Sequence, residues 1–269
     1  MQQRFPRIMG ILNTTPDSFS DGGNLYRNGV LDLELAVKTA SKMVDEGADI
    51  LDIGGESSGP DSKNISLEEE IQRVVPVISM IRERFSKDRV LISVDTYKAE
   101  VARQAVLAGA DLVNDVTALR GDPEMASVLV EADIPVVLMY SKDSAVRTTR
   151  EVREYPDVVA TISAFFEERI AFAESRGILR RRIFLDPGLG FFVSGDPKYS
   201  FEIIDRLEEF QRFQLPIVLG PSRKSFLGGA LGERLEKTIA VCQKVASKGV
   251  SILRVHDVGA VRGALLKWL

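Results

Sequence analysis

Residues 90–116 read VLISVDTYKAEVARQAVLAGADLVNDV, and they contain the repeating unit that decides the fold. Two short apolar runs rich in β-branched residues, Val90–Val94 and Leu112–Val116, predict buried strands. Between them, apolar residues recur at three- and four-residue spacing over Ala99–Ala108, which predicts an amphipathic helix. Gly109 follows where that helix would end, as glycine often does. The stretch therefore predicts a strand, a crossover helix and a second, parallel strand.

The same unit recurs along the whole chain. Apolar runs predict strands at Ile8–Leu12, Ile50–Ile53, Val90–Val94, Leu112–Val116, Val136–Met139, Ile183–Leu185, Ile217–Leu219 and Ile252–Val255. Helical spacing predicts helices at Leu33–Val44, Leu67–Phe85, Ala99–Ala108, Glu124–Ala132, Val158–Glu174, Phe201–Phe213, Leu235–Ala246 and Val261–Trp268. Eight such units predict an α/β protein in which residues 1–269 form one (β/α)8 TIM barrel domain, with an open doubly wound sheet as the alternative.

Composition and charge narrow the class of protein. The chain has 45% hydrophobic and 28% charged residues, a balance typical of soluble globular proteins. It lacks an apolar run long enough to span a bilayer, and polar residues 1–7 precede a short apolar run without a signal-like cleavage site, so we expect a cytoplasmic protein. The net charge of −4 argues against nucleic acid and acidic membranes as partners. Any anion site must be local.

Two scarce residue types limit the chemistry. The one cysteine, Cys242, excludes an internal disulfide and a cysteine-rich zinc site. It falls inside a helical apolar pattern, which predicts a buried packing residue. The one histidine, His256, excludes multi-histidine metal sites and leaves a single imidazole for acid–base work.

Acidic and amide side chains end several predicted strands. Asp95, Asn114 and Asp186 stand at three such ends, and the carboxyl ends of barrel strands converge on one mouth where active sites lie. Each residue alone would often cap the following helix. Together they suit a ligand rich in N–H donors, because a carboxylate accepts two parallel hydrogen bonds.

Basic residues follow the last two predicted strands. Ser222, Arg223 and Lys224 come after the seventh strand, and Arg254 and His256 end the eighth. Many barrels bind phosphate at this position through loop amides and nearby cations. The sequence thus predicts a bipolar mouth, acidic at one end and basic at the other, and a substrate with both features.

These motifs run in order across nearly the whole chain, and together they resemble dihydropteroate synthase. They are MGILNTTPDSFSDGG at 9–23, DIGGES at 52–57, SVDT at 93–96, ND at 114–115, DPGLGF at 186–191, SRK at 222–224 and RVHDV at 254–258. The resemblance implies a (β/α)8 barrel, usually dimeric. It also implies condensation of 6-hydroxymethyl-7,8-dihydropterin diphosphate with 4-aminobenzoate, which gives 7,8-dihydropteroate and diphosphate for folate synthesis.

The resemblance implies a role for each matching residue. Asp186 would bind the 2-amino and N3–H edge of the pterin, Asn114 and Asp95 the remaining ring nitrogens, and Lys224 the ring carbonyl side. Asn13 matches the family's Mg²⁺ ligand, and the diphosphate would supply further oxygens. Arg254 and His256 would complete the anion site. The remaining predicted substrate-binding residues are Ser57, Ser58, Phe191 and Ser222.

The resemblance also implies the order of the chemistry. Diphosphate leaves first, and the amine of aminobenzoate attacks the resulting pterin-methylene cation. Mg²⁺, Arg254 and His256 would stabilise the leaving group, Asp95 the cation, and Lys224 would counter charge at the ring. No protein nucleophile is needed, and His256 is expected to bind diphosphate rather than act as a general base.

The chain departs from the family pattern in the loops. The family's second loop commonly reads Glu-Ser-Thr-Arg-Pro-Gly, whereas this chain has Gly59 in place of the arginine. Lys63 and Arg27 are the candidate substitutes for its charge, and weaker catalysis is the alternative. Further changes fall near the expected aminobenzoate end. Phe192 and Val193 replace a frequent Gly-Lys pair, and Tyr140 replaces a frequent histidine.

Two other functions compete with this prediction. A pterin-binding methyltransferase-like barrel would have no diphosphate to bind, so the basic residues at 222–224 and 254–256 argue against it. A pterin-binding homologue with impaired turnover is the other alternative, because Gly59 stands where the family commonly has an arginine. Phe192 leaves two alternatives, a site narrowed against sulfonamides or simple packing.

Overall fold

Eight parallel strands form the central sheet of the structure, a computed structural model that describes residues 5–16 and 25–268. The sheet order is β8-β7-β6-β5-β4-β1-β10-β9, and its two ends meet at a single bridge between Leu185 and Ile217. The sheet is therefore a nearly closed barrel. The strands are β1 (Arg7–Asn13), β4 (Ile50–Gly54), β5 (Leu91–Asp95), β6 (Leu112–Asp115), β7 (Val136–Met139), β8 (Ile183–Asp186), β9 (Val218–Leu219) and β10 (Ile252–Val255). All eight predicted strands and the TIM barrel are confirmed, and the open-sheet alternative is wrong.

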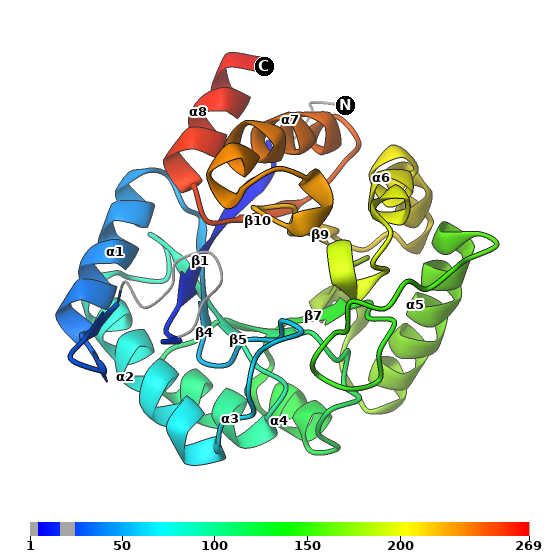
Figure 1. Cartoon of the computed structure of the whole chain (residues 1–269). Coiled ribbons are helices and arrows are strands. Elements are labelled where there is room, and N and C mark those ends of the chain that lie inside the picture. Colours follow the sequence, from blue (N-terminus) through cyan, green and yellow to red (C-terminus); the bar gives the residue numbers. More distant parts are fainter. Residues whose placement is uncertain (1–4, 17–24, 269) are drawn as a thin grey trace.

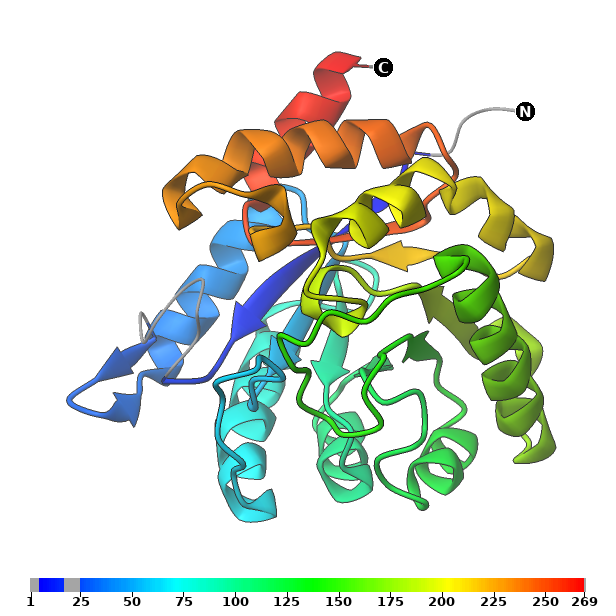
Figure 2. The ribbon, with the colours of Figure 1, turned by 45° about the vertical axis from the view of Figure 1, so that its right-hand side comes forward.

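Helices surround the barrel, as Figure 1 shows in a view along its central space. They are α1 (Leu33–Asp45), α2 (Leu67–Arg84), α3 (Ala99–Leu107), α4 (Met125–Ala132), α5 (Val158–Ser175), α6 (Pro197–Asp205), α7 (Arg234–Ala246) and α8 (Val258–Trp268). Turned by 45°, the molecule shows a short hairpin of β2 (Tyr26–Arg27) and β3 (Val30–Leu31) projecting from one side (Figure 2), and the sequence pattern did not predict it. Throughout the described ranges, every helix is too short or too polar for a bilayer crossing.

The predicted helix at Phe201–Phe213 is wrong in its bounds. The α-helix begins at Pro197, because the Asp196 side chain accepts a hydrogen bond from the Lys198 N–H at 2.9 Å and proline fits the first helical position. It ends at Arg206, whose φ of −108° leaves helical geometry, and a 3₁₀ segment continues over Leu207–Phe213. The apolar spacing was read correctly, but the hydrogen-bond pattern changes within it.

Glycine at the end of α3 is required by geometry. Gly109 has a φ of +113°, in the left-handed region that side chains with a Cβ disfavour. A Cβ at this position would also approach the Arg82 Cγ to 2.6 Å. The helix-ending glycine expected from the sequence is therefore confirmed here.

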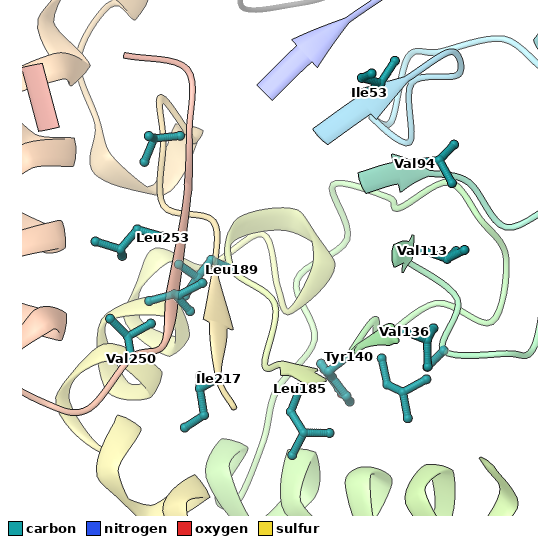
Figure 3. Packing of buried hydrophobic residues seen from close by; sticks show 14 of the residues in the cluster. Ile53, Val94, Val113, Val136, Tyr140, Leu185, Leu189, Ile217, Val250 and Leu253 are labelled. Carbon is teal, nitrogen blue, oxygen red and sulfur yellow. The ribbon is translucent and has the colours of Figure 1, made fainter. Parts of the chain in front are cut away.

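The apolar core has two parts, on opposite faces of the barrel wall. The larger part lies between the strands and the helices. In Figure 3, Ile53, Val94 and Val113 of this part point away from the central space of the barrel. Cys242 belongs to this part and is fully buried, as predicted. Inside the barrel a smaller cluster forms a floor: Met9, Ile50, Leu112, Val137, Val218 and Ile252. Because side chains alternate along a strand, the next inward positions lie above this floor, toward the mouth.

Candidate active site

The predicted acidic residue on β5 and the predicted amide residue on β6 are neighbours at the barrel mouth. Asp95 lies opposite Asn114 in the parallel register, and Asn114 is 5% exposed. Neither caps a helix, because the residue at the start of α3 is Lys98 and that at the start of α4 is Glu124. The capping alternative is therefore wrong for both. Neither side chain is therefore used to begin a helix.

Asp52 on β4 organises this end of the mouth, although the sequence analysis assigned it no role. It is fully buried, and its Oδ2 accepts hydrogen bonds from Asn114 Nδ2 at 3.1 Å and Arg254 Nε at 2.5 Å. Arg254 also donates to Asp95 Oδ2 at 2.6 Å. A charged residue inside the otherwise apolar run Ile50–Ile53 was the signal that could have found it. Asp52 holds two predicted substrate-binding residues in place.

Two buried polar atoms in this layer have no hydrogen-bond partner among the described residues. They are Asp52 Oδ1 and Ser93 Oγ, and their residues are opposite each other in the β4–β5 register. Buried polar groups are almost always hydrogen-bonded, so such atoms need a partner from outside the chain. A polar ring bound in the mouth, or water, would supply one.

Arg254 corrects the prediction of a bipolar mouth. The guanidinium was expected at the basic end with His256, but it lies between the carboxylates of Asp52 and Asp95, both on the acidic side. The reason is electrostatic, because two buried carboxylates side by side need a cation. A diphosphate bound at the mouth would therefore meet an arginine that already has two carboxylate partners.

Burial perturbs the titration of Asp95. Loss of water raises its pKa to about 7, the Arg254 charge opposes that rise, and the neighbouring Asp52 charge adds to it. Near neutral pH this carboxyl group exchanges its proton readily. Perturbed carboxyl groups of this kind are typical of functional sites.

Asp186 and Lys224 carry opposite charges at the mouth, and each affects the pKa of the other. Asp186 is 6% exposed, and its Oδ1 accepts the Gly188 N–H at 2.8 Å, which leaves Oδ2 for a ligand. Burial raises the pKa of Asp186, opposed chiefly by the Lys224 charge. Burial lowers the pKa of Lys224 to about 8, opposed by Asp186. Lys224 Nζ donates to the Leu189 carbonyl at 3.1 Å, so backbone, carboxylate and ammonium lie together where the pterin edge was predicted.

His256 and Ser222 meet at the basic end. The His256 N–H donates to Ser222 Oγ at 3.1 Å, and Nδ1 lies 3.0 Å from the same oxygen. Burial, with the positive charges of Arg254, Arg223 and Lys224, lowers the pKa of His256 to about 3. The imidazole is therefore neutral at physiological pH, which agrees with a ligand-binding role and not with a cationic one. Arg223 pairs with Asp257, Nη2 to Oδ1 at 2.6 Å.

Asn13, the predicted Mg²⁺ ligand, is the last residue of β1 and lies opposite Gly54 in the register. Its amide oxygen is a hard donor that suits Mg²⁺. In residues 5–16 and 25–268, no three His, Cys, Asp or Glu side chains form a metal-binding group. The donors present thus fit an ion held mainly by substrate oxygens and water. Residues 17–24 of the first-loop motif lie outside the described residues.

Ser57 and Ser58 lie in the β4–α2 connection, and a residue the sequence analysis missed holds this connection. Arg147, from the β7–α5 connection, donates to Glu56, Ser62, Asn64 and the Lys63 carbonyl. Neither candidate for the missing arginine has this position. Arg27, on the outer hairpin, pairs with Asp32. Lys63 contributes its backbone carbonyl, which accepts a hydrogen bond from Arg147.

A cavity of about 310 Å³ lies beside Ser57. It opens between the start of the first loop, just after β1, the β4–α2 connection and α2. Its lining residues are Thr15, Pro16, Ser57, Asp61, Ser62, Lys63, Ile65 and Arg73.

The unusual aromatic residues divide into two groups. Tyr140 is 3% exposed, packs edge-on against Phe165 at 5.2 Å, and bonds to the Tyr155 hydroxyl, so it is a packing residue outside the mouth. Phe192 lies at the mouth, with its ring centroid 5.0 Å from Lys224 Nζ. Phe191 is half-buried beside it, and its carbonyl accepts from Thr148 Oγ1 at 2.6 Å.

Comparison with known proteins decides the family. The model of the family described as pterin binding enzyme matches residues 9–256. The chain belongs to this family, among the dihydropteroate synthases. The dihydropteroate synthase of Escherichia coli K12 is 43% identical over 257 residues, covering 94% of this chain and 87% of that protein. That of Synechocystis is 39% identical, covering 94% and 86%.

Solved dihydropteroate synthases have the same barrel. The Yersinia pestis enzyme, crystallised with a sulfonamide drug complex, superposes with a TM-score of 0.91 at 35% identity, covering 100% of this chain and 94% of that one. The Xanthomonas albilineans enzyme in complex with 7,8-dihydropteroate gives a TM-score of 0.84 at 38% identity, with the same coverage. The family fold therefore extends over the whole described barrel, mouth included.

Proposed function

We propose that this chain is a dihydropteroate synthase, which joins 6-hydroxymethyl-7,8-dihydropterin diphosphate to 4-aminobenzoate and releases diphosphate. The observation that carries the proposal is the polar layer above the apolar floor, where Asp95 lies opposite Asn114 and where Asp186 and Lys224 affect each other's pKa. Acceptors and one ammonium group match the alternating donors and acceptors of a pterin edge. The family membership and the relatives named as dihydropteroate synthases support the same activity.

Binding of the pterin uses two buried acceptors, Asp186 and Asn114, and one donor, Lys224. Asp186 Oδ2 accepts from the 2-amino and N3–H edge, while Oδ1 stays bonded to Gly188. Asn114, whose amide nitrogen donates to Asp52, presents its oxygen to a ring N–H. Lys224 donates to the ring carbonyl side. The bound ring then lies above the apolar floor and is shielded from water on that side.

The chemical step follows from the charges. The bond between the pterin methylene carbon and the diphosphate oxygen breaks, and its electron pair leaves with diphosphate. The Asp95 carboxylate stabilises the positive charge left on the ring. The amine of 4-aminobenzoate then attacks the methylene carbon and loses a proton to solvent. The neutral His256 and Ser222 donate hydrogen bonds to the departing diphosphate, and Arg254, which Asp52 and Asp95 hold, stabilises it through its positive charge.

Asn13 would hold Mg²⁺ at the end of β1, with diphosphate oxygens as its other main ligands. The ion would neutralise charge on the leaving group. The hard oxygen of the Asn13 amide and its place at the carboxyl end of β1 support this assignment. Ser57, Ser58 and Phe191 contact the second substrate, and the cavity beside Ser57 supports that placement.

We further propose that residues 1–269 form one functional domain that works as a homodimer in the cytoplasm. Leu266 and Trp268 on α8 are 62% and 46% exposed, and packing against a second copy would remove such apolar side chains from water. Sedimentation velocity over a range of concentrations tests the dimer.

The experiment that tests the function follows both products. Purified protein, pterin diphosphate, 4-aminobenzoate and Mg²⁺ should give dihydropteroate and diphosphate in equal amounts. The Lys224→Met variant should lose this activity, whereas Lys42→Met, which removes a 75% exposed lysine on α1, should retain it. Binding of pterin diphosphate without product, at saturating aminobenzoate and Mg²⁺, would instead identify a homologue that has lost turnover.

A further inference from the structure

The β7–α5 connection, residues 140–157, joins two walls of the mouth. On one side it bonds to the β8–α6 connection, with Lys142 N–H donating to the Phe192 carbonyl at 2.7 Å and Tyr155 Oη to the Val193 carbonyl at 2.6 Å. On the other side its Thr148 N–H donates to the Ser58 carbonyl at 3.2 Å. The connection is therefore anchored to a predicted substrate-binding loop from across the mouth.

Arg147 makes most of the contacts to that loop. Its Nε donates to Ser62 Oγ at 3.1 Å, Nη1 to Asn64, and Nη2 to Glu56 and to the Lys63 carbonyl at 2.6 Å. One guanidinium thus fixes four residues of the β4–α2 connection. Its side chain is only 20% exposed, so these bonds are partly shielded from water.

Glu56 connects Arg147 to a buried charge network. The Glu56 side chain is 4% exposed, and its second oxygen accepts from Lys98 Nζ at 2.8 Å. Lys98 also donates to the fully buried Glu70 at 2.7 Å, and Glu70 accepts from Thr96 Oγ1 at 2.7 Å. The negative charges of Glu56 and Glu70 are balanced by the positive charges of Arg147 and Lys98. Arg147 is therefore already paired within the protein. Its charge holds the loop and is not available to bind a substrate anion.

The turn that carries Arg147 is held by hydrogen bonds and an ion pair of its own. Lys142, whose side chain is 2% exposed, pairs with Asp143 at 2.6 Å. Asp143 also accepts from the Thr149 N–H at 3.0 Å, and Lys142 Nζ donates to Thr149 Oγ1 at 2.7 Å. Arg147 therefore projects from a fixed base, and a fixed base is what a side chain needs to order another loop.

We propose that Arg147 is a positioning residue for the acceptor end of the site: it holds Ser57 and Ser58 in place from the opposite wall of the mouth. The β4–α2 connection has Gly59 where the family's own loop arginine commonly stands, so its order comes from the β7–α5 connection. The role assigned to the two serines rests on the proposed function, whereas the Arg147 contacts do not.

The test compares Arg147→Ala and Arg147→Lys with Arg103→Ala. Arg103 lies on α3, is 41% exposed and pairs with Glu131. The control Arg103→Ala therefore removes the same charge at a position away from the mouth. We expect Arg147→Ala to raise KM for 4-aminobenzoate about tenfold or more, the size of one hydrogen bond to a charged group, with kcat changed only a few-fold. The KM of Arg147→Lys should lie between those of Arg147→Ala and wild type, because lysine keeps the positive charge but lacks the several N–H donors of the planar guanidinium.

Hydrogen exchange gives a readout that does not depend on turnover. Amides of residues 55–66 should exchange faster in Arg147→Ala than in wild type, and those of the barrel strands should not. The dissociation constant for pterin diphosphate should be unchanged, which also shows that the variant is folded. Unchanged exchange at 55–66 together with an unchanged KM would overturn the proposal. A wild-type protein without synthase activity would overturn the proposed function, while the exchange result would still decide the role of Arg147 in holding the loop.

Discussion

Asp186→Asn is the most informative single change at the pterin end of the site. Asparagine keeps the size of the side chain, and its Oδ1 still accepts the Gly188 N–H that aspartate accepts at 2.8 Å. The other terminal atom changes from an acceptor to a donor, and it would then face the N–H donors of the pterin. The substitution therefore changes ligand recognition while it preserves the local turn.

The expected loss follows from the burial of this carboxylate. Asp186 is 6% exposed, so water cannot replace the lost acceptor. A hydrogen bond to a charged group contributes about 1.5–3 kcal/mol, and two ligand donors meet this carboxylate. We expect a loss of about 3 kcal/mol, which weakens binding by about 150-fold. The variant also removes the charge that raises the Lys224 pKa, so more of Lys224 is neutral at pH 7 and a further donor is weakened.

Isothermal titration calorimetry with pterin diphosphate at pH 7 measures this loss directly. Asp205→Asn is the matched control, because Asp205 lies on α6 with its side chain 57% exposed and pairs with Lys244 on the outside of the barrel. It should bind like wild type. A dissociation constant for Asp186→Asn within threefold of wild type, in a variant that melts at the wild-type temperature, would refute the assignment of Asp186 to the pterin edge.

Three further predictions concern titration, the leaving group and the core. The pH profile of kcat/KM should be bell-shaped. The value falls below about pH 7 as Asp95 gains a proton, and it falls above about pH 8 as Lys224 loses one. Lys224→Arg should move only the alkaline limb, to higher pH. His256→Gln should leave both limbs of the pH profile unmoved, because the pKa of His256 is about 3. It should raise KM for pterin diphosphate about tenfold through loss of a hydrogen bond. A shift of the acid limb in this variant would contradict the neutral state of His256. Phe166→Ala, at a fully buried ring against Phe210, should lower the free energy of unfolding in urea by about 3–5 kcal/mol, and a loss below 1 kcal/mol would show that the core refills the space.

The barrel was predictable because its signals are local. Each strand is a short apolar run, and each run is bounded by turn residues within a few positions, as at Val136–Met139, where prediction and structure coincide. The bounds of α6 were not predictable from apolar spacing alone. Spacing does not distinguish an α-helix from a following 3₁₀ segment, and the cap at Asp196 decided the start.

The site was predictable only where the fold itself gathers residues. Strand ends meet at the mouth of any parallel barrel, so Asp95, Asn114 and Asp186 could be grouped before the structure was known. Pairing within the mouth was not predictable. Arg254 meets Asp52 across 202 positions and Arg147 meets Glu56 across 91, and no local pattern encodes such partners. Their contacts depend on how side chains share buried charge, which only the folded chain determines.

The sheet order places β10 between β1 and β9, so the last strand of the barrel pairs with the first. During synthesis, β1 emerges early but its open edge has no neighbour until residues 252–255 leave the ribosome. A newly made chain therefore carries an exposed strand edge for almost the whole of translation, which is the kind of edge that promotes association with other chains. Because the barrel closes at its final strand, the nascent chain stays open to association with other chains until synthesis is nearly complete.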